Sequence, residues 1–162
     1  MKHSHRIPPL LLGALLAVIA CGAPPPVTPE PSPTAAAQPV ATQPPLAVLT
    51  FPGGEPTAGD LGTYIYRGAG SDSPWLPGEP VVVPAAGTLG EVFLSEPLTV
   101  TAWRARVAPA GQAPLNGEGR QIAVGEGRMV FELPSGAWTL QLSVQFGEGI
   151  GEAIYYWQLG QG

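Results

Sequence analysis

The sequence predicts an all-β protein, with one antiparallel β-sandwich of about seven to eight strands over residues 47–162. Three observations support this fold class. Apolar and polar residues alternate with a period of two in the last third of the chain, as in strands with one buried face. Short runs of branched and aromatic residues are separated by glycine and proline turn signals, a spacing typical of sandwiches. No stretch combines a 3.6-residue apolar period with capping residues, so we expect almost no helix.

Residues 1–20 have the features of a leader that is removed from the mature chain. Lys2 and Arg6 precede an uncharged apolar run over residues 7–20. This run is shorter than the roughly 20 residues that a membrane-spanning helix needs. A basic start followed by a short apolar core is typical of a secretory signal peptide.

The leader ends in Val18-Ile19-Ala20-Cys21, and these residues resemble the lipobox of bacterial lipoprotein signal peptides. The resemblance implies cleavage before Cys21 and a lipid, with palmitate-type acyl chains, on its thiol. The alternative is an ordinary signal peptide with a cysteine near the cut by chance, but a lone thiol in an exported chain calls for an explanation. The expected location is extracytoplasmic, lipid-anchored to the bacterial cell membrane or cell surface, since two acyl chains give stable anchoring. By the same resemblance, Gly22 in place of aspartate disfavours retention in an inner membrane.

Removal of the leader leaves few side chains suited to catalysis. It takes away the only lysine and both histidines, so the mature chain keeps five arginines against twelve acidic residues, a net charge of −7. That charge argues against binding to nucleic acid. Without histidine, lysine or a free cysteine, the usual nucleophile–base systems, Schiff bases and sites for zinc, copper or iron cannot be built. We therefore expect neither enzymatic activity nor a cofactor.

Residues 21–46 are expected to be the lipidated cysteine and a disordered linker. Residues 22–45 contain nine prolines, one charge at Glu30 and no aromatic residue. Such a segment buries too little apolar surface to offset the entropy of ordering. Its prolines favour the polyproline II conformation at about 3.1 Å per residue, a reach of up to roughly 75 Å. The linker would lift the folded domain off the membrane.

The clearest strands are the last three. In residues 138–146 one face is apolar and the other polar, so we expect a buried and a solvated side. Residues 147–151 form a hairpin connection to a returning strand, and residues 128–133 alternate in the same way. The residues expected to face the core are Trp138, Leu140, Leu142, Val144, Phe146, Ala153, Tyr155, Trp157, Leu159, Met129, Phe131 and Leu133; those expected to face outward are Thr139, Gln141, Ser143, Gln145, Arg128, Val130 and Glu132.

The earlier strands are less regular, and we expect them at residues 47–51, 63–67, 81–83, 90–94 and 98–107. In the last of these, Leu98, Val100 and Ala102 share a parity with two arginines, whereas Trp103 and Val107 lie on the other parity. A bulge or a change of the buried face near Ala102 would resolve this conflict.

The sequence "FELPSGAWTLQLSVQFGEGIGEAIYYWQL", with its Leu-Pro-x-Gly turn, long alternating strand and Tyr-Tyr pair, resembles the closing strands of uncharacterised Ig-like lipoproteins of Gram-positive-type bacteria. "GDLGTYIYRG" corresponds to a Tyr-Cys-Trp strand of that group, with Ile65 in the place of the cysteine. The resemblance implies an Ig-like β-sandwich without that group's disulfide. It implies no activity.

Two loops are candidate binding sites. The loop of residues 67–84 contains Asp72, Trp75 and Glu79, and Asp60 precedes it. The acidic residues could bind calcium, although isolated acidic residues on loops are usually only solvated. Trp75 could stack on a sugar or contact a protein partner, or it could cover one end of the sandwich. Residues 109–120 form a second long loop, of the kind that carries binding surfaces in sandwiches.

Together these features predict a membrane-anchored, non-enzymatic binding or structural module of the cell envelope, with an envelope protein or glycan as partner. One alternative is a lipoprotein that binds a small ligand, calcium or carbohydrate. Another is a carboxylate-dependent hydrolase, but the acidic residues show no recognisable catalytic pair.

Overall fold

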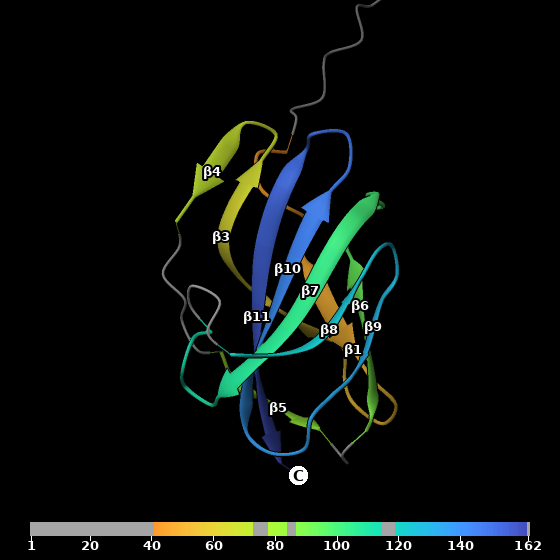
Figure 1. The fold of residues 1–162 in the computed structure, drawn as a ribbon, viewed down its shortest axis with the longest axis vertical. Helices are drawn as coiled ribbons and strands as arrows, with labels where there is room; N and C mark the ends of the chain where they lie inside the picture. Colours follow the sequence, from red (N-terminus) through yellow and green to blue (C-terminus); the bar gives the residue numbers. More distant parts are fainter. Residues whose placement is uncertain (1–40, 73–77, 84–86, 115–118, 162) are drawn as a thin grey trace, which may run out of the picture. The chain divides into compact units, whose positions relative to one another are not determined.

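The computed structural model describes residues 41–72, 78–83, 87–114 and 119–161. Within these ranges the chain forms eleven strands and no helix, which confirms the expected all-β fold (Figure 1). No helix of this part of the chain is long and apolar enough to cross a membrane. The strands are β1 (Ala47–Thr50), β2 (Thr57–Ala58), β3 (Asp60–Tyr66), β4 (Ala69–Ser71), β5 (Pro80–Val83), β6 (Leu89–Leu94), β7 (Val100–Pro109), β8 (Arg120–Gly125), β9 (Met129–Glu132), β10 (Trp138–Phe146) and β11 (Gly151–Gln161).

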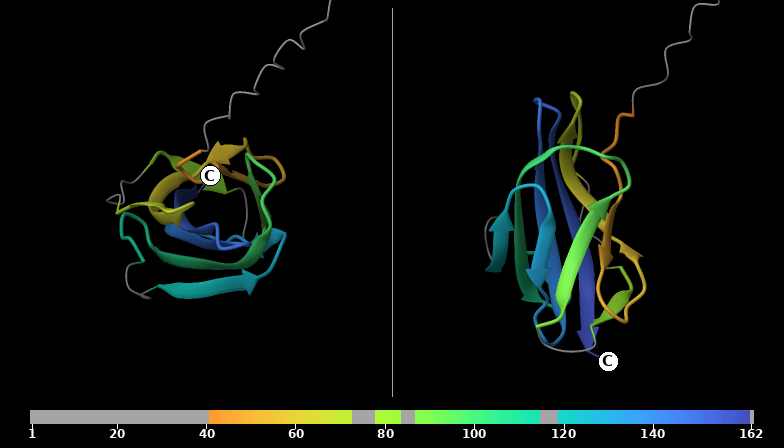
Figure 2. Two further views of the ribbon diagram at one scale, coloured as in Figure 1. Left: turned by 90° about the horizontal axis from the view of Figure 1, so that it is seen from above. Right: turned by 90° about the vertical axis from the view of Figure 1, so that its right-hand side faces the viewer.

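The strands form two sheets that pack face to face as a sandwich (Figure 2). The four-stranded sheet has the order β2-β1-β6-β9. The seven-stranded sheet has the order β4-β3-β11-β10-β7-β8, and β5 also pairs with β11. All pairings are antiparallel except the one between β5 and β11. Each of the eight strands expected from the sequence is present, and the three additional strands are β2, β4 and β8.

The core includes the alternating residues of β9, β10 and β11, as predicted, except Trp138, which is only half-buried. In the register of β10 with β11, Leu140 lies opposite Trp157 and Leu142 opposite Tyr155, and these residues are buried. The outer residues Arg128 and Glu132 are exposed. Tyr64 and Tyr66 of β3 also belong to the core cluster.

A β-bulge in β7 resolves the parity conflict in this strand. Gln145 of β10 pairs with Ala102, but the next residue, Phe146, pairs with Val100, so Thr101 is the extra residue. An extra residue reverses the faces of all residues after it. Val100 is therefore buried before the bulge, and Trp103 and Val107 are buried after it. The expected change of face near Ala102 is confirmed.

The first half of the outward face of β10 is buried, although it was predicted to be solvated. Gln145 is exposed as expected, but Thr139 and Gln141 are buried. Gln141 Nε2 donates to the Tyr156 hydroxyl at 3.1 Å, and Gln158 Nε2 donates to Thr139 Oγ1 at 3.3 Å. The backbone N–H of Gly111, in the loop after β7, donates to Gln158 Oε1 at 3.4 Å. The prediction was wrong here because a segment distant in sequence folds over this part of the sheet.

Packing of the domain begins before β1. Pro44 and Pro45 are buried, whereas Ala47 was the expected first residue of the domain. The Tyr155 hydroxyl donates to the Pro45 carbonyl at 2.7 Å. Leu46 N–H donates to Ser95 Oγ at 3.0 Å, and Ser95 N–H donates to the Leu46 carbonyl at 2.8 Å. The end of the linker is thus fixed to the sandwich by hydrogen bonds to Tyr155 of the larger sheet and to Ser95, the residue after β6.

An exposed ion pair links β6 to the start of β9 and makes stability depend on pH. Arg128 donates to both carboxylate oxygens of Glu91, with Nη2 and Oε2 2.7 Å apart, and this hydrogen bonding lowers the pKa of Glu91. A carboxyl group whose pKa is lowered by folding stabilises the fold above its unfolded pKa, and this stabilisation is lost as the pH falls through the folded pKa. We expect a higher urea midpoint for the wild type than for Glu91→Gln near neutral pH, and a difference that shrinks as the pH falls below about 4. A difference independent of pH, or one equally shown by the exposed control Glu126→Gln, would contradict this.

Candidate functional site

The structure describes only some of the residues selected from the sequence, and the Asp60 carboxylate lies beside Gly78, the residue before Glu79. Asp60, Asp72 and Glu79 are exposed. Cys21 and Trp75 lie outside the described residues. The described part of the chain contains no group of three or more acidic, histidine or cysteine side chains placed to hold a metal ion.

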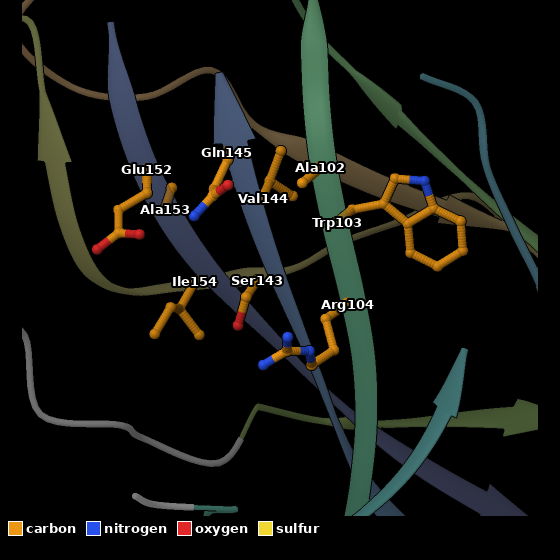
Figure 3. Close-up of a pocket in the computed structure, with 9 residues that line it drawn as sticks. All are labelled: Ala102, Trp103, Arg104, Ser143, Val144, Gln145, Glu152, Ala153 and Ile154. Carbon is orange, nitrogen blue, oxygen red and sulfur yellow. The ribbon is translucent and has the colours of Figure 1, made fainter. Parts of the chain in front are cut away.

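A hollow of about 270 Å³ lies on the outer face of the seven-stranded sheet, over β7, β10 and β11 (Figure 3). Two rows of side chains form it, because residues opposite each other on neighbouring strands point to the same face. The first row is Arg104, Ser143 and Ile154, and the second is Ala102, Gln145 and Glu152.

The hollow exists because short side chains lie between longer ones. Ser143 is a short side chain between Arg104 and Ile154, and Ala102 beside Gln145 is the shortest side chain of the second row. The bulge at Thr101 is also required. Without it, Arg104 would keep the parity of the buried Val100 and point into the core.

Two opposite charges stand on either side of the hollow. Arg104 extends toward Ser143, and Glu152 lies on the other side beside Ile154 (Figure 3). They belong to strands separated by β10, so the strands that carry them are about 10 Å apart. Neither side chain makes a hydrogen bond or ion pair with another described residue. Within the described part of the chain, both charges therefore lack an ionic partner.

Exposed apolar side chains flank the hollow on the neighbouring strands. Val124 of β8 pairs with Arg104, and Ile65 of β3 pairs with Glu152. Their side chains are 56% and 59% exposed, among the most exposed large apolar residues described. These apolar side chains would add buried contact area if a partner bound over the hollow.

The described lining of the hollow offers groups for binding. Among its described residues Glu152 is the one carboxylate, whereas the usual glycosidase mechanism uses two across a cleft. Ser143 has no described general base beside it. The hollow can therefore supply charge pairing and hydrogen bonds to a ligand.

Sequence reasoning did not select Arg104 and Glu152 as a pair. Two features of the sequence could have indicated this surface: the parity conflict around Arg104 and the short outward side chains Ala102 and Ser143. The alignment of Arg104 with Glu152 depends on the register of β7, β10 and β11, which the alternation within each strand does not specify.

No protein-family model, no curated protein and no solved structure matches the chain. The role of the hollow is therefore inferred from its side chains.

Proposed function

We propose that this protein is a membrane-anchored extracytoplasmic lipoprotein and that its sandwich is a non-enzymatic binding module of the cell envelope. The residues before Cys21 support a lipid anchor by their resemblance to a lipobox. The resemblance of residues 131–159 to the closing strands of Ig-like lipoproteins supports the same class of protein. The observation that carries the binding role is the hollow in the outer sheet face, with its two charges of opposite sign.

The expected partner is a segment of another envelope protein. Arg104 and Glu152 would pair with one acidic and one basic side chain of the partner, separated by about two strand spacings, roughly 10 Å. Ile65 and Val124 would add apolar contact at the edges. The only aromatic residue in the lining, Trp103, is buried toward the core, so the hollow offers no ring on which a sugar could stack.

Charge reversal in the hollow tests this proposal. We expect Arg104→Glu to weaken binding of the mature chain, kept soluble by Cys21→Ala, to isolated envelopes by at least about tenfold, because it places like charges together. Glu152→Arg should have a similar effect. Binding would be measured by co-sedimentation of the fluorescently labelled protein.

The matched control is Arg67→Glu, which reverses the charge of an exposed arginine in the turn between β3 and β4, outside the hollow. This variant should bind like the wild type. Equal binding by the wild type, Arg104→Glu and Glu152→Arg would exclude the hollow as the binding surface.

A further inference from the structure

A second hollow, of about 460 Å³, lies at the end of the sandwich where β9 ends and β10 begins. This end is opposite to the one at which residues 41–46 enter the domain (Figures 1 and 2). The side chains of Arg120, Gln121, Glu132, Ser135 and Trp138 contribute to its lining. Its size is within the range of small-ligand pockets, about 300–1,000 Å³.

Trp138 provides a fixed aromatic surface in this end hollow. It was expected to be a core residue, but it is only half-buried, because it is the first residue of β10. Its indole Nε1 donates to the Ser135 carbonyl at 2.7 Å. Gly136 in the same turn has a φ of 107°, and a Cβ there would lie 3.1 Å from Nε1. The turn therefore needs glycine at this position and orients the indole ring.

Polar side chains surround the tryptophan. The guanidinium carbon of Arg120 lies 5.7 Å from the Trp138 ring centroid, a cation–π contact. Gln121 and Glu132 are exposed, and their side chains make no hydrogen bond or ion pair with another described residue. The end hollow thus combines one apolar ring with hydrogen-bonding groups that have no described partner.

We propose that the end hollow binds a neutral sugar unit, a hexose or N-acetylhexosamine, of an envelope glycan. A pyranose ring has an apolar face of C–H groups and a periphery of hydroxyls. Trp138 matches the face, while Gln121, Glu132, Ser135 and Arg120 can bond the hydroxyls. Arg120 is exposed and can move from the ring to a hydroxyl, because exposed cation–π contacts are weak. Glu132 and the negative net charge of the mature chain disfavour anionic sugars.

Titration of the full mature chain carrying Cys21→Ala with sugars, followed by ¹H–¹⁵N NMR, tests the proposal. The probes are N,N′-diacetylchitobiose, cellobiose and digalacturonate. We expect one or both neutral probes to bind in the millimolar range and to shift the indole N–H signal of Trp138. Digalacturonate should not bind.

Two variants change exposed residues of the end hollow, so a loss of sugar binding in them cannot be attributed to a loss of folding. Glu132→Gln and Gln121→Ala should weaken neutral-sugar binding by about tenfold, the cost of one hydrogen bond to a charged or amide group. Trp75→Ala and Arg104→Glu should leave sugar binding unchanged. The end hollow and the hollow over β7, β10 and β11 are therefore tested independently. The proposal is overturned if neither neutral probe binds, if only digalacturonate binds, or if Trp75→Ala rather than Glu132→Gln removes binding.

Discussion

Replacement of Leu142 by alanine is expected to lower the free energy of unfolding by about 2–5 kcal/mol. Leu142 is fully buried in β10 and lies between Ala105 of β7 and Tyr155 of β11. Truncation would remove apolar contacts from the centre of the larger sheet and leave a cavity, since strands held on both sides can close only part of it. Equilibrium urea unfolding of the mature chain carrying Cys21→Ala measures the effect.

Val124→Ala is the matched control. Val124 is also an aliphatic strand residue, but its side chain is 56% exposed on β8. Its truncation should change the free energy of unfolding by no more than about 0.5 kcal/mol. Similar costs for Leu142→Ala and Val124→Ala would mean that the core does not lie on the predicted face of β10.

Tyr155→Phe is expected to destabilise the domain by about 1–3 kcal/mol, the cost of a lost buried hydrogen bond. The Tyr155 hydroxyl donates to the Pro45 carbonyl at 2.7 Å and joins the larger sheet to the segment before β1. Phenylalanine keeps the ring and its packing but leaves the Pro45 carbonyl without this donor. Tyr64→Phe is the control, because Tyr64 is buried and its hydroxyl makes no hydrogen bond with another described residue.

The effect of Tyr155→Phe should also depend on pH. Burial, and to a lesser extent the neighbouring Tyr66, raise the pKa of Tyr155 far above its ordinary value of 10.0. A group whose pKa is raised by folding contributes its full stabilisation below the unfolded pKa and loses it as the pH rises toward the folded pKa. The advantage of wild type over Tyr155→Phe should therefore shrink above about pH 10. A constant difference between pH 7 and pH 11 would contradict the buried, hydrogen-bonded phenol.

The strands that were predicted well are those whose burial depends on local alternation. In β10 and β11 every second residue is apolar over most of the strand, so the core face follows from the pleat of each strand. The bulge in β7 was also predictable, because Val100 and Trp103 cannot both be buried without an extra residue between them.

Features set by distant segments were not predictable from such patterns. Thr139 and Gln141 have the composition of a solvated face, yet the loop containing Gly111 covers this part of the sheet. β8 was missed because "RQIAVG" lacks a clear alternation and borders glycine-rich turns. Its position depends on pairing with β7, which includes a second irregularity near Ala105.

The same distinction applies to the candidate sites. Composition predicted binding sites on irregular loops, whereas the hollow over β7, β10 and β11 arises from the register of three regular strands. Arg104 and Glu152 are 48 positions apart in the sequence and face the same side only because β10 pairs with both β7 and β11. Trp138 was assigned to the core from its parity, and its place at the end of the strand leaves it half-buried.

Lipid attachment at Cys21 is the most direct test of the proposed function. Cells expressing the full chain would be fed an alkyne analogue of palmitate, and the protein would then be purified, coupled to a fluorophore and located by fractionation. The account predicts a labelled wild-type protein in the membrane fraction and an unlabelled Cys21→Ala variant that leaves it. A wild-type protein without label, or equal labelling of Cys21→Ala, would contradict an anchor at this residue and with it the proposed function.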